Sequence, residues 1–190
     1  MRRTATVLAP SLLLAAACGG DLFGPDAQGE ALLAELPTAE ARGESKNFVS
    51  PLSGSQEVPA VVTGGTGNAV FKLGPDGTSL DYKLIASNIE GVTQSHIHCG
   101  TPGVNGPIVV FLFGFVAAGV APNGILAQGT IEADDVIARG DSGACPGGVA
   151  DLDDVIEKLR TGGAYVNVHT LVKPGGEIRG HVHEAGPSIQ

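Results

Sequence analysis

Tryptophan is absent from the 190-residue chain, methionine occurs once, and aromatic residues make up only 4% of the sequence. Basic side chains are also scarce: 11 lysines and arginines stand against 20 acidic residues, for a formal net charge of −9. A nucleic-acid partner requires basic side chains to neutralise phosphates, so this balance argues against one. Long helical periodicities are few, whereas glycine accounts for 29 residues. That composition is typical of short strands joined by many turns.

The amino terminus has the features of an export signal. Two arginines precede an apolar run over residues 7–14, and three alanines lead directly into Cys18. A charged segment, an apolar segment and a small-residue cleavage site are typical of a signal peptide, and the apolar run is too short to span a bilayer. The cysteine after the alanines resembles the lipobox of bacterial lipoproteins. We therefore expect a signal peptide over residues 1–17 and a lipid on Cys18; an ordinary secretory signal that leaves a free Cys18 is the alternative.

Export has consequences for the rest of the chain. Residues 18–46 are largely small, polar and acidic, so we expect a flexible tether between the lipid and a folded domain. The lipid on Cys18 would anchor the protein to a membrane of the cell envelope, in the periplasm or at the cell surface. The two remaining cysteines, Cys99 and Cys145, form an even pair in an oxidising compartment, which predicts a disulfide. Two buried free thiols are the alternative.

The middle and end of the chain are dominated by residues that alternate between apolar and polar. Residues 69–73 and 80–84 alternate on either side of a Gly-Pro-Asp-Gly turn, which predicts a β-hairpin. A ten-residue segment at 151–160 has apolar residues on one helical face and predicts one short amphipathic helix. The fold class is therefore all-β, an antiparallel sandwich or flattened barrel. Further strands are expected over residues 92–98, 107–113, 125–132, 164–170 and 177–183.

Three of the five histidines have a spacing that suits a metal ion. His96 and His98 lie two apart on one predicted strand and so point to the same face, about 6.5 Å apart. His169 ends another predicted strand, on the face opposite its valines. If the two strands are neighbours, the three rings converge, and copper or zinc are the candidate ions. A purely structural, hydrogen-bonded role for these histidines is the alternative, and the sequence does not exclude it.

Other polar residues lie close to these strands. The predicted strands at 164–170 and 177–183 form a hairpin, which brings Asn167, Glu177 and Arg179 near His169 and allows Glu177 to orient one ring. A second pair, His181 and His183, has the same spacing but lies near the carboxyl terminus, so a metal role is less well supported there.

The sequence gives little support for catalysis. Ser95 adjoins His96, but alternation along a strand sends the two side chains to opposite faces, and no Gly-x-Ser-x-Gly motif occurs. We therefore expect a protein that is not an enzyme.

An ordered series of motifs resembles the CHRD (chordin) domain over residues 47–184, leaving 185–190 as a short tail. The resemblance implies an immunoglobulin-like β-barrel, and it places His96, His98, His169, Glu177 and Arg179 at motif positions of the family. The family occurs in chordin, an extracellular antagonist of growth factors, and in microbial exported proteins, so an extracellular protein partner is also expected. The motifs are 52–59, 67–71, 96–100, 103–107, 163–170 and 174–180.

The sequence thus predicts a non-enzymatic, membrane-anchored CHRD-domain binding lipoprotein, with its histidine cluster as a candidate site for copper or zinc. Two alternatives stay open. A dismutase-like copper enzyme would need a fixed histidine site with an open coordination position, by analogy with the His-x-His strand of Cu,Zn superoxide dismutase. A structural or adhesion domain would need no small ligand, and scattered histidines would favour it.

Overall fold

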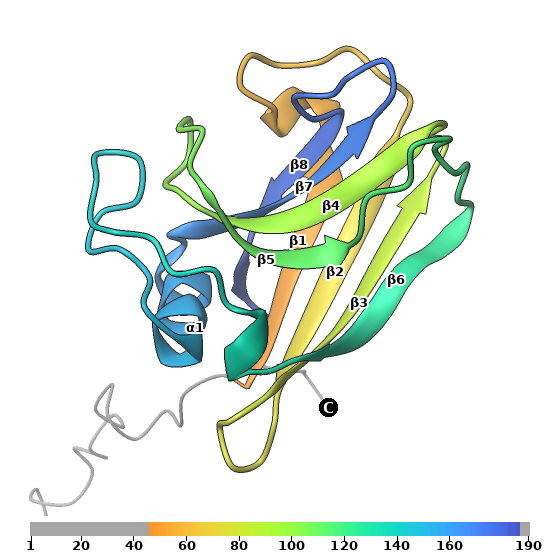
Figure 1. Cartoon of the computed structure of the whole chain (residues 1–190). Helices are drawn as coiled ribbons and strands as arrows, with labels where there is room; N and C mark the ends of the chain where they lie inside the picture. Colours follow the sequence, from red (N-terminus) through yellow and green to blue (C-terminus); the bar gives the residue numbers. More distant parts are fainter. Residues whose placement is uncertain (1–45, 187–190) are drawn as a thin grey trace, which may run out of the picture. The chain divides into compact units, whose positions relative to one another are not determined.

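A computed structural model of the chain describes residues 46–186. Nine strands and one α-helix occupy about half of this part of the chain, with two short 3₁₀ helices, η2 and η3, at the ends of strands (Figure 1). The elements in chain order are β1 (Asn47–Ser53), η2 (Gly54–Gln56), β2 (Thr66–Leu73), β3 (Leu80–Ser87), β4 (Val92–Cys99), β5 (Ile108–Phe113), β6 (Gly124–Ile131), η3 (Ala133–Asp135), α1 (Leu152–Thr161), β7 (Ala164–Thr170), β8 (Ile178–His181) and β9 (His183–Glu184).

The strands form one antiparallel sheet that curls into a nearly closed barrel. Its order is β5-β4-β7-β8-β1-β2-β3-β6, and β9 pairs with β1 beside β8. The two edge strands, β5 and β6, approach each other at the seam. There the Tyr82 hydroxyl of β3 donates a hydrogen bond to the Leu112 carbonyl of β5, at 2.7 Å. The prediction of an all-β fold is confirmed.

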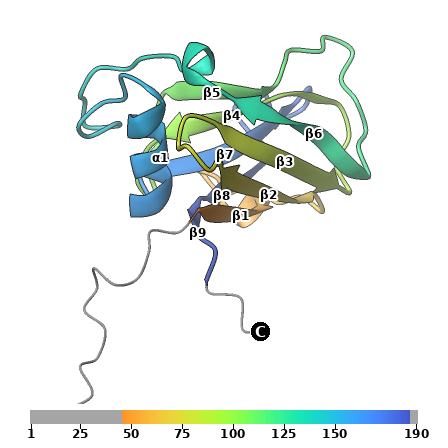
Figure 2. The same cartoon turned by 90° about the horizontal axis from the view of Figure 1, so that it is seen from below.

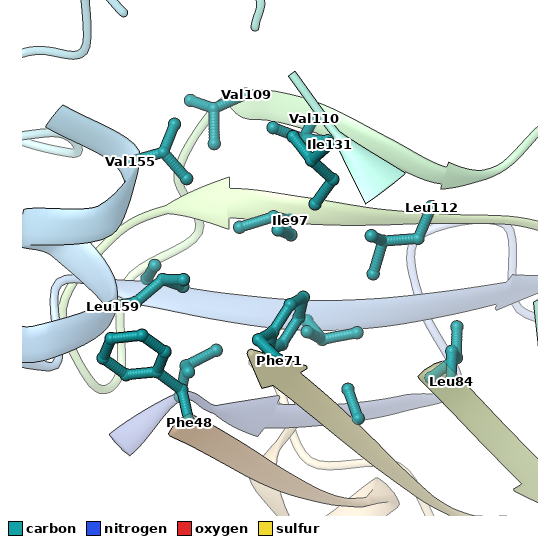
Figure 3. Close-up of a cluster of buried hydrophobic side chains, with 14 of the residues drawn as sticks. Phe48, Phe71, Leu84, Ile97, Val109, Val110, Leu112, Ile131, Val155 and Leu159 are labelled. Atoms are coloured by element: carbon teal, nitrogen blue, oxygen red, sulfur yellow. The ribbon is translucent and has the colours of Figure 1, made fainter. Parts of the chain in front are cut away.

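Alternating residues of the strands fill the barrel. On β2, Ala69, Phe71 and Leu73 are buried while Val70 is partly exposed, as the two-residue period predicts. Inward side chains from opposite walls meet in one cluster, in which Phe71 and Leu84 lie below Ile97 and Leu112 in the view of Figure 3. One face of each strand therefore packs in the hydrophobic core, and the other face points away from it.

Helix α1 closes one end of the barrel. Its apolar face is buried, and Val155 and Leu159 project towards the core in Figure 3. The helix begins after Asp151, whose carboxylate accepts a hydrogen bond from the Asp154 N–H at 3.1 Å, and ends at Gly162, which adopts a left-handed conformation with φ of 72°. Figure 2 shows α1 beside the ends of β4 and β7. The predicted helix is confirmed.

A disulfide joins Cys99, at the end of β4, to Cys145 in the loop before α1, as the cysteine count predicts. Both cysteines are buried. The bridge holds the loop of residues 136–151 against the barrel.

Two expectations about strands need correction. The predicted strand at 177–183 is two shorter ones, β8 and β9, because Val182 breaks the run of pairing and turns into the core. Strand β1 was not predicted, although it lies in the middle of the sheet order. Among residues 46–186, no helix has the length and hydrophobicity that a membrane span requires.

Candidate metal site

The candidate site lies on the outer face of β4 and β7, opposite the hydrophobic core. On β4, Ile97 points into the barrel, while His96 and His98 point outwards. On β7, Val166 and Val168 belong to the core, yet every residue of the strand is buried. The outer face of β7 must therefore be covered by another part of the chain.

Three loops form this cover, and hydrogen bonds join them to one another and to β8. The loop of residues 54–65 contacts the β7–β8 turn, where Thr63 donates to the Glu177 carboxylate at 2.6 Å. The same loop contacts that of residues 100–107, where the Asn105 amide donates to the Val58 carbonyl at 2.8 Å. Figure 1 shows the first loop and the β7–β8 turn side by side at the top of the view. We call these three segments, 54–65, 100–107 and 171–177, the covering loops.

Beneath the covering loops, His96, His98 and His169 come together. Strands β4 and β7 are antiparallel neighbours, with Gln94 opposite His169 and Asn167 opposite His96. One nitrogen from each of the three rings can be chosen so that the three atoms lie within 4.8 Å of one another. The exposed fractions of the side chains are 0%, 8% and 7%. The structure thus makes the juxtaposition that the strand spacing predicted.

Backbone carbonyls set the orientation and protonation of two of the rings. The Nδ1 atom of His98 lies 2.9 Å from the Gly106 carbonyl oxygen, and Nδ1 of His169 lies 2.9 Å from that of Pro174. A carbonyl can only accept, so both Nδ1 atoms carry the proton, and each Nε2 is unprotonated and has a lone pair. Both carbonyls belong to covering loops. The expectation that Glu177 orients a ring is wrong, because its two carboxylate oxygens accept from the hydroxyls of Thr63 and Thr170.

The third ring, His96, is the link between the other two. Its Nδ1 atom lies 3.2 Å from Nε2 of His169, and its ring centroid is 5.5 Å from that of His98. Since Nε2 of His169 is unprotonated, Nδ1 of His96 donates the hydrogen bond and Nε2 of His96 has a lone pair. Neither that atom nor Nε2 of His98 has a hydrogen-bond partner, although both are buried. Phe111 of β5 packs edge-on against His96 at 4.4 Å and is half exposed, so it forms the outer wall of the cluster.

Burial keeps all three histidines neutral. It lowers the pKa of His96 to about 3, with a further contribution from His169 and His98, and it lowers the pKa of His98 to about 4. Burial also lowers the pKa of His169. At neutral pH the cluster therefore offers nitrogen lone pairs rather than protons, which is the state in which imidazole binds a metal ion.

A cation lies behind the cluster, on the far side of Tyr165. The ring of Tyr165 stacks on His98 with 4.8 Å between centroids and 8° between planes. The guanidinium carbon of Arg179 lies 3.5 Å from the centroid of the same ring. Because β7 lies between β4 and β8 in the sheet, His98 and Arg179 take opposite sides of Tyr165. Arg179 has no exposed surface, and its hydrogen bonds go to Val104, Asn105 and His181.

Glu57 is the carboxyl group that acts most strongly on Arg179. It is buried with 7% of its surface exposed, and burial raises its pKa to about 7 against the opposing effect of Arg179. Its side chain lies beside Asn167 and the backbone of Gly176, and neither Oε1 of Glu57 nor Oδ1 of Asn167 has a hydrogen-bond partner. The expected polar neighbours Asn167, Glu177 and Arg179 lie near the cluster, but the hydrogen bonds of His96, His98 and His169 go to one another and to backbone carbonyls.

The second histidine pair does not join the cluster. His181 lies on the other side of Arg179, with its Nε2 atom 3.2 Å from a guanidinium nitrogen, and burial together with Arg179 lowers its pKa. His183 is exposed on β9. In the part of the chain that the structure describes, only His96, His98 and His169 form a group suited to a metal ion. Cys18, the expected lipid attachment site, lies outside the described residues.

Two important residues of the site were not predicted. Tyr165 could have been found, because it alternates with Asn167 and His169 along the same strand and so shares their face. Glu57 belongs to a loop, and no periodicity in the sequence places it next to Arg179.

The comparisons with known proteins identify a family but no characterised relative. The family model described as the CHRD domain matches residues 48–182, which is more than half of the chain. No curated protein and no solved structure matches the sequence significantly.

Proposed function

This chain belongs to the CHRD domain family, and we propose that it is a membrane-anchored, exported binding module whose His96, His98 and His169 hold one copper or zinc ion. The observation that carries the proposal is the arrangement of lone pairs. Nε2 of His98 and Nε2 of His169 are both unprotonated and held by carbonyls on the other side of each ring. Metal-binding histidines commonly have this second hydrogen bond, which fixes the ring for coordination.

The distance between His96 and His169 supports the same conclusion. Nitrogen ligands lie about 2.0–2.1 Å from zinc. For an ion bound to two nitrogens 3.2 Å apart, the nitrogen–metal–nitrogen angle would be about 100°, near the tetrahedral value. Binding would replace the proton between the two rings, and His96 would then carry its proton on Nε2. His98 would complete the set after a small movement, because the widest separation among the three atoms is 4.8 Å.

A three-nitrogen set leaves one tetrahedral position without a protein ligand. Among the described residues, no carboxylate or thiolate joins the histidine group. An open position is also what a catalytic metal site requires, and this observation favours a dismutase-like copper enzyme as the second candidate. We place binding first because the hydrogen bonds of the three rings go to one another and to backbone carbonyls, and none joins the described cluster to a nucleophile or to another acid–base side chain.

Calorimetric titration with Zn²⁺ and Cu²⁺ at neutral pH tests the proposal. The protein should carry Cys18→Ser, so that both of its remaining cysteines are in the disulfide and none is free. We expect one equivalent to bind with micromolar or tighter affinity, and His96→Ala and His169→Ala each to abolish binding. The matched control is His183→Ala, which removes an exposed histidine and should leave binding unchanged. Binding that survives both cluster substitutions would exclude the site.

The membrane anchor has its own test. In cells supplied with labelled palmitate, the unchanged protein should incorporate label and fractionate with membranes. Cys18→Ser should abolish both, whereas Cys145→Ser should abolish neither, because that cysteine is buried in the folded domain. Release of unlabelled wild-type protein as a soluble exported form would contradict lipidation and favour an ordinary secretory signal.

A further inference from the structure

We infer that the histidine site holds copper in its monovalent state, Cu⁺, in preference to Cu²⁺ or Zn²⁺. The inference rests on the proposed ion-binding function and adds the charge of the ion to it. The three ligands alone do not decide between these ions. The inference therefore rests on the charges around the cluster.

The ligands bring no negative charge to the ion. All three are neutral imidazoles, and within residues 46–186 no Asp, Glu or Cys joins the group. A divalent ion would therefore keep both of its charges in a site where the side chains are at least nine-tenths buried. Burying a charge without a compensating partner is costly, and the cost rises steeply with the size of the charge.

The nearest buried charge makes this cost larger. Arg179 is fully buried and separated from His98 only by the ring of Tyr165. The partners of its hydrogen bonds are a carbonyl, an amide oxygen and an imidazole, so none of them neutralises the guanidinium. A metal ion at the histidines is thus repelled by Arg179, and a divalent ion twice as strongly as a monovalent one.

Neither of the two neighbouring acids supplies a ligand that would balance the charge of the ion. Glu57 is the acid that acts on Arg179, but its raised pKa of about 7 leaves it partly protonated at neutral pH. Glu177 directs both carboxylate oxygens to threonine hydroxyls and makes no hydrogen bond with the nitrogens of the three rings. Neither carboxylate is a member of the histidine group.

The surroundings also suit an ion with few ligands. Zn²⁺ is almost always four-coordinate in proteins, whereas Cu⁺ is stable with two or three nitrogen ligands. Phe111 covers His96 with an apolar ring, and Tyr165 covers His98. Neither ring brings a ligand atom to the group, so the described chain supplies three nitrogens and no fourth ligand.

The decisive measurement is the reduction potential of the bound copper. Copper is added to the Cys18→Ser protein, and a mediated titration follows Cu²⁺ + e⁻ → Cu⁺, with the electron supplied by the reduced mediator. A potential above that of the aqueous Cu²⁺/Cu⁺ pair means that the site binds Cu⁺ more tightly than Cu²⁺, as we expect. A potential below the aqueous value would overturn the inference and leave the proposed function intact. If neither form of copper, nor Zn²⁺, binds at the histidines, the proposed function itself fails.

Two variants test the electrostatic cause. Arg179→Met removes the buried cation and should tighten binding of Cu²⁺ at least tenfold while changing the affinity for Cu⁺ less than threefold. Because Arg179 is buried, Glu57→Gln provides a second variant with less effect on packing. At pH 8.5, where Glu57 is largely ionised, this change should weaken binding of Cu²⁺ more than that of Cu⁺. Equal changes for the two ions in both variants would overturn the role assigned to Arg179.

Discussion

Nδ1 of His96 lies 3.2 Å from Nε2 of His169, close enough for a hydrogen bond and close to the separation of two nitrogen ligands on one ion. The two rings reach this position from neighbouring strands, and a proton or a metal ion can occupy the space between them. If the proposed ion binds here, His96 and His169 already lie at the separation it requires, and we expect binding to increase the stability of the domain with little change in its structure.

Added metal should stabilise the domain. A ligand that binds only the folded state at about one hundred times its Kd contributes about 2.7 kcal/mol, which is a rise of several degrees in Tm. We expect Zn²⁺, which does not change oxidation state, to produce this rise and EDTA to reverse it, as followed by thermal unfolding. His98→Phe should remove the effect, and His183→Ala should keep it. An equal rise in Tm for the His98→Phe protein would show that the ion binds elsewhere.

Glycine is required at position 176. A β-carbon there would lie 2.5 Å from Oδ1 of Asn167 and 2.6 Å from Oε1 of Glu57, and the residue has φ of 126°. We expect Gly176→Ala to lower the free energy of unfolding by about 2 kcal/mol through this crowding and the backbone strain. Gly175→Ala is the matched control, because nothing lies within 4 Å of a β-carbon there. Urea unfolding of the two variants provides the comparison, and equal losses would refute the explanation.

Glu57 should make stability depend on pH in a definite direction. Its pKa rises from 4.5 to about 7 on folding, so the folded state binds the proton more tightly. Its contribution to stability is fully present below pH 4.5 and is lost as the pH rises through 7. Relative to the unchanged protein, Glu57→Gln should therefore be more stable at pH 8.5 than at pH 5, by roughly 1–2 kcal/mol. Urea unfolding at the two pH values measures this difference, and a difference of the opposite sign would contradict the raised pKa.

The disulfide should contribute substantially to stability. Cys99 and Cys145 are 46 positions apart, and closing a loop of that length restricts the unfolded chain by about 4 kcal/mol in the chain-entropy account. The double change Cys99→Ser and Cys145→Ser should lower the free energy of unfolding by about that amount in guanidinium titrations. A loss below about 1 kcal/mol would mean that the cross-link adds little beyond the packing of the two side chains.

The sequence predicted those parts of the fold in which alternation is regular. In β2 and β3, apolar and polar residues alternate cleanly on either side of a Gly-Pro-Asp-Gly turn, and both strands lie where the pattern indicates. Strand β1 was missed because its three inward residues are Phe48, Ser50 and Leu52, and the polar Ser50 together with Pro51 hides the alternation. Ser50 is accommodated in the interior because its hydroxyl donates to the Gly180 carbonyl at 2.7 Å.

The site was predictable to the same extent and for the same reason. Two-residue spacing put His96 and His98 on one face, and the pairing of β4 with β7 added His169. The groups that orient the rings could not be predicted, because they are the carbonyls of Gly106 and Pro174, which any residue type supplies. Their positions depend on the path of the covering loops. We expected Glu177 to orient a ring because carboxylates commonly orient histidines. Its carboxylate instead accepts hydrogen bonds from two hydroxyl groups.

Strand β7 is buried on both sides, and its two faces carry different side chains. Val166 and Val168 pack in the barrel, whereas Tyr165, Asn167 and His169 lie under the covering loops. Because neighbouring positions point in opposite directions, a substitution in the site removes no atom from the hydrophobic core. The barrel can therefore serve as a scaffold in which the ligand set is redesigned, for example with a carboxylate in place of His169 to favour divalent ions, while the packing that holds the strands together is retained.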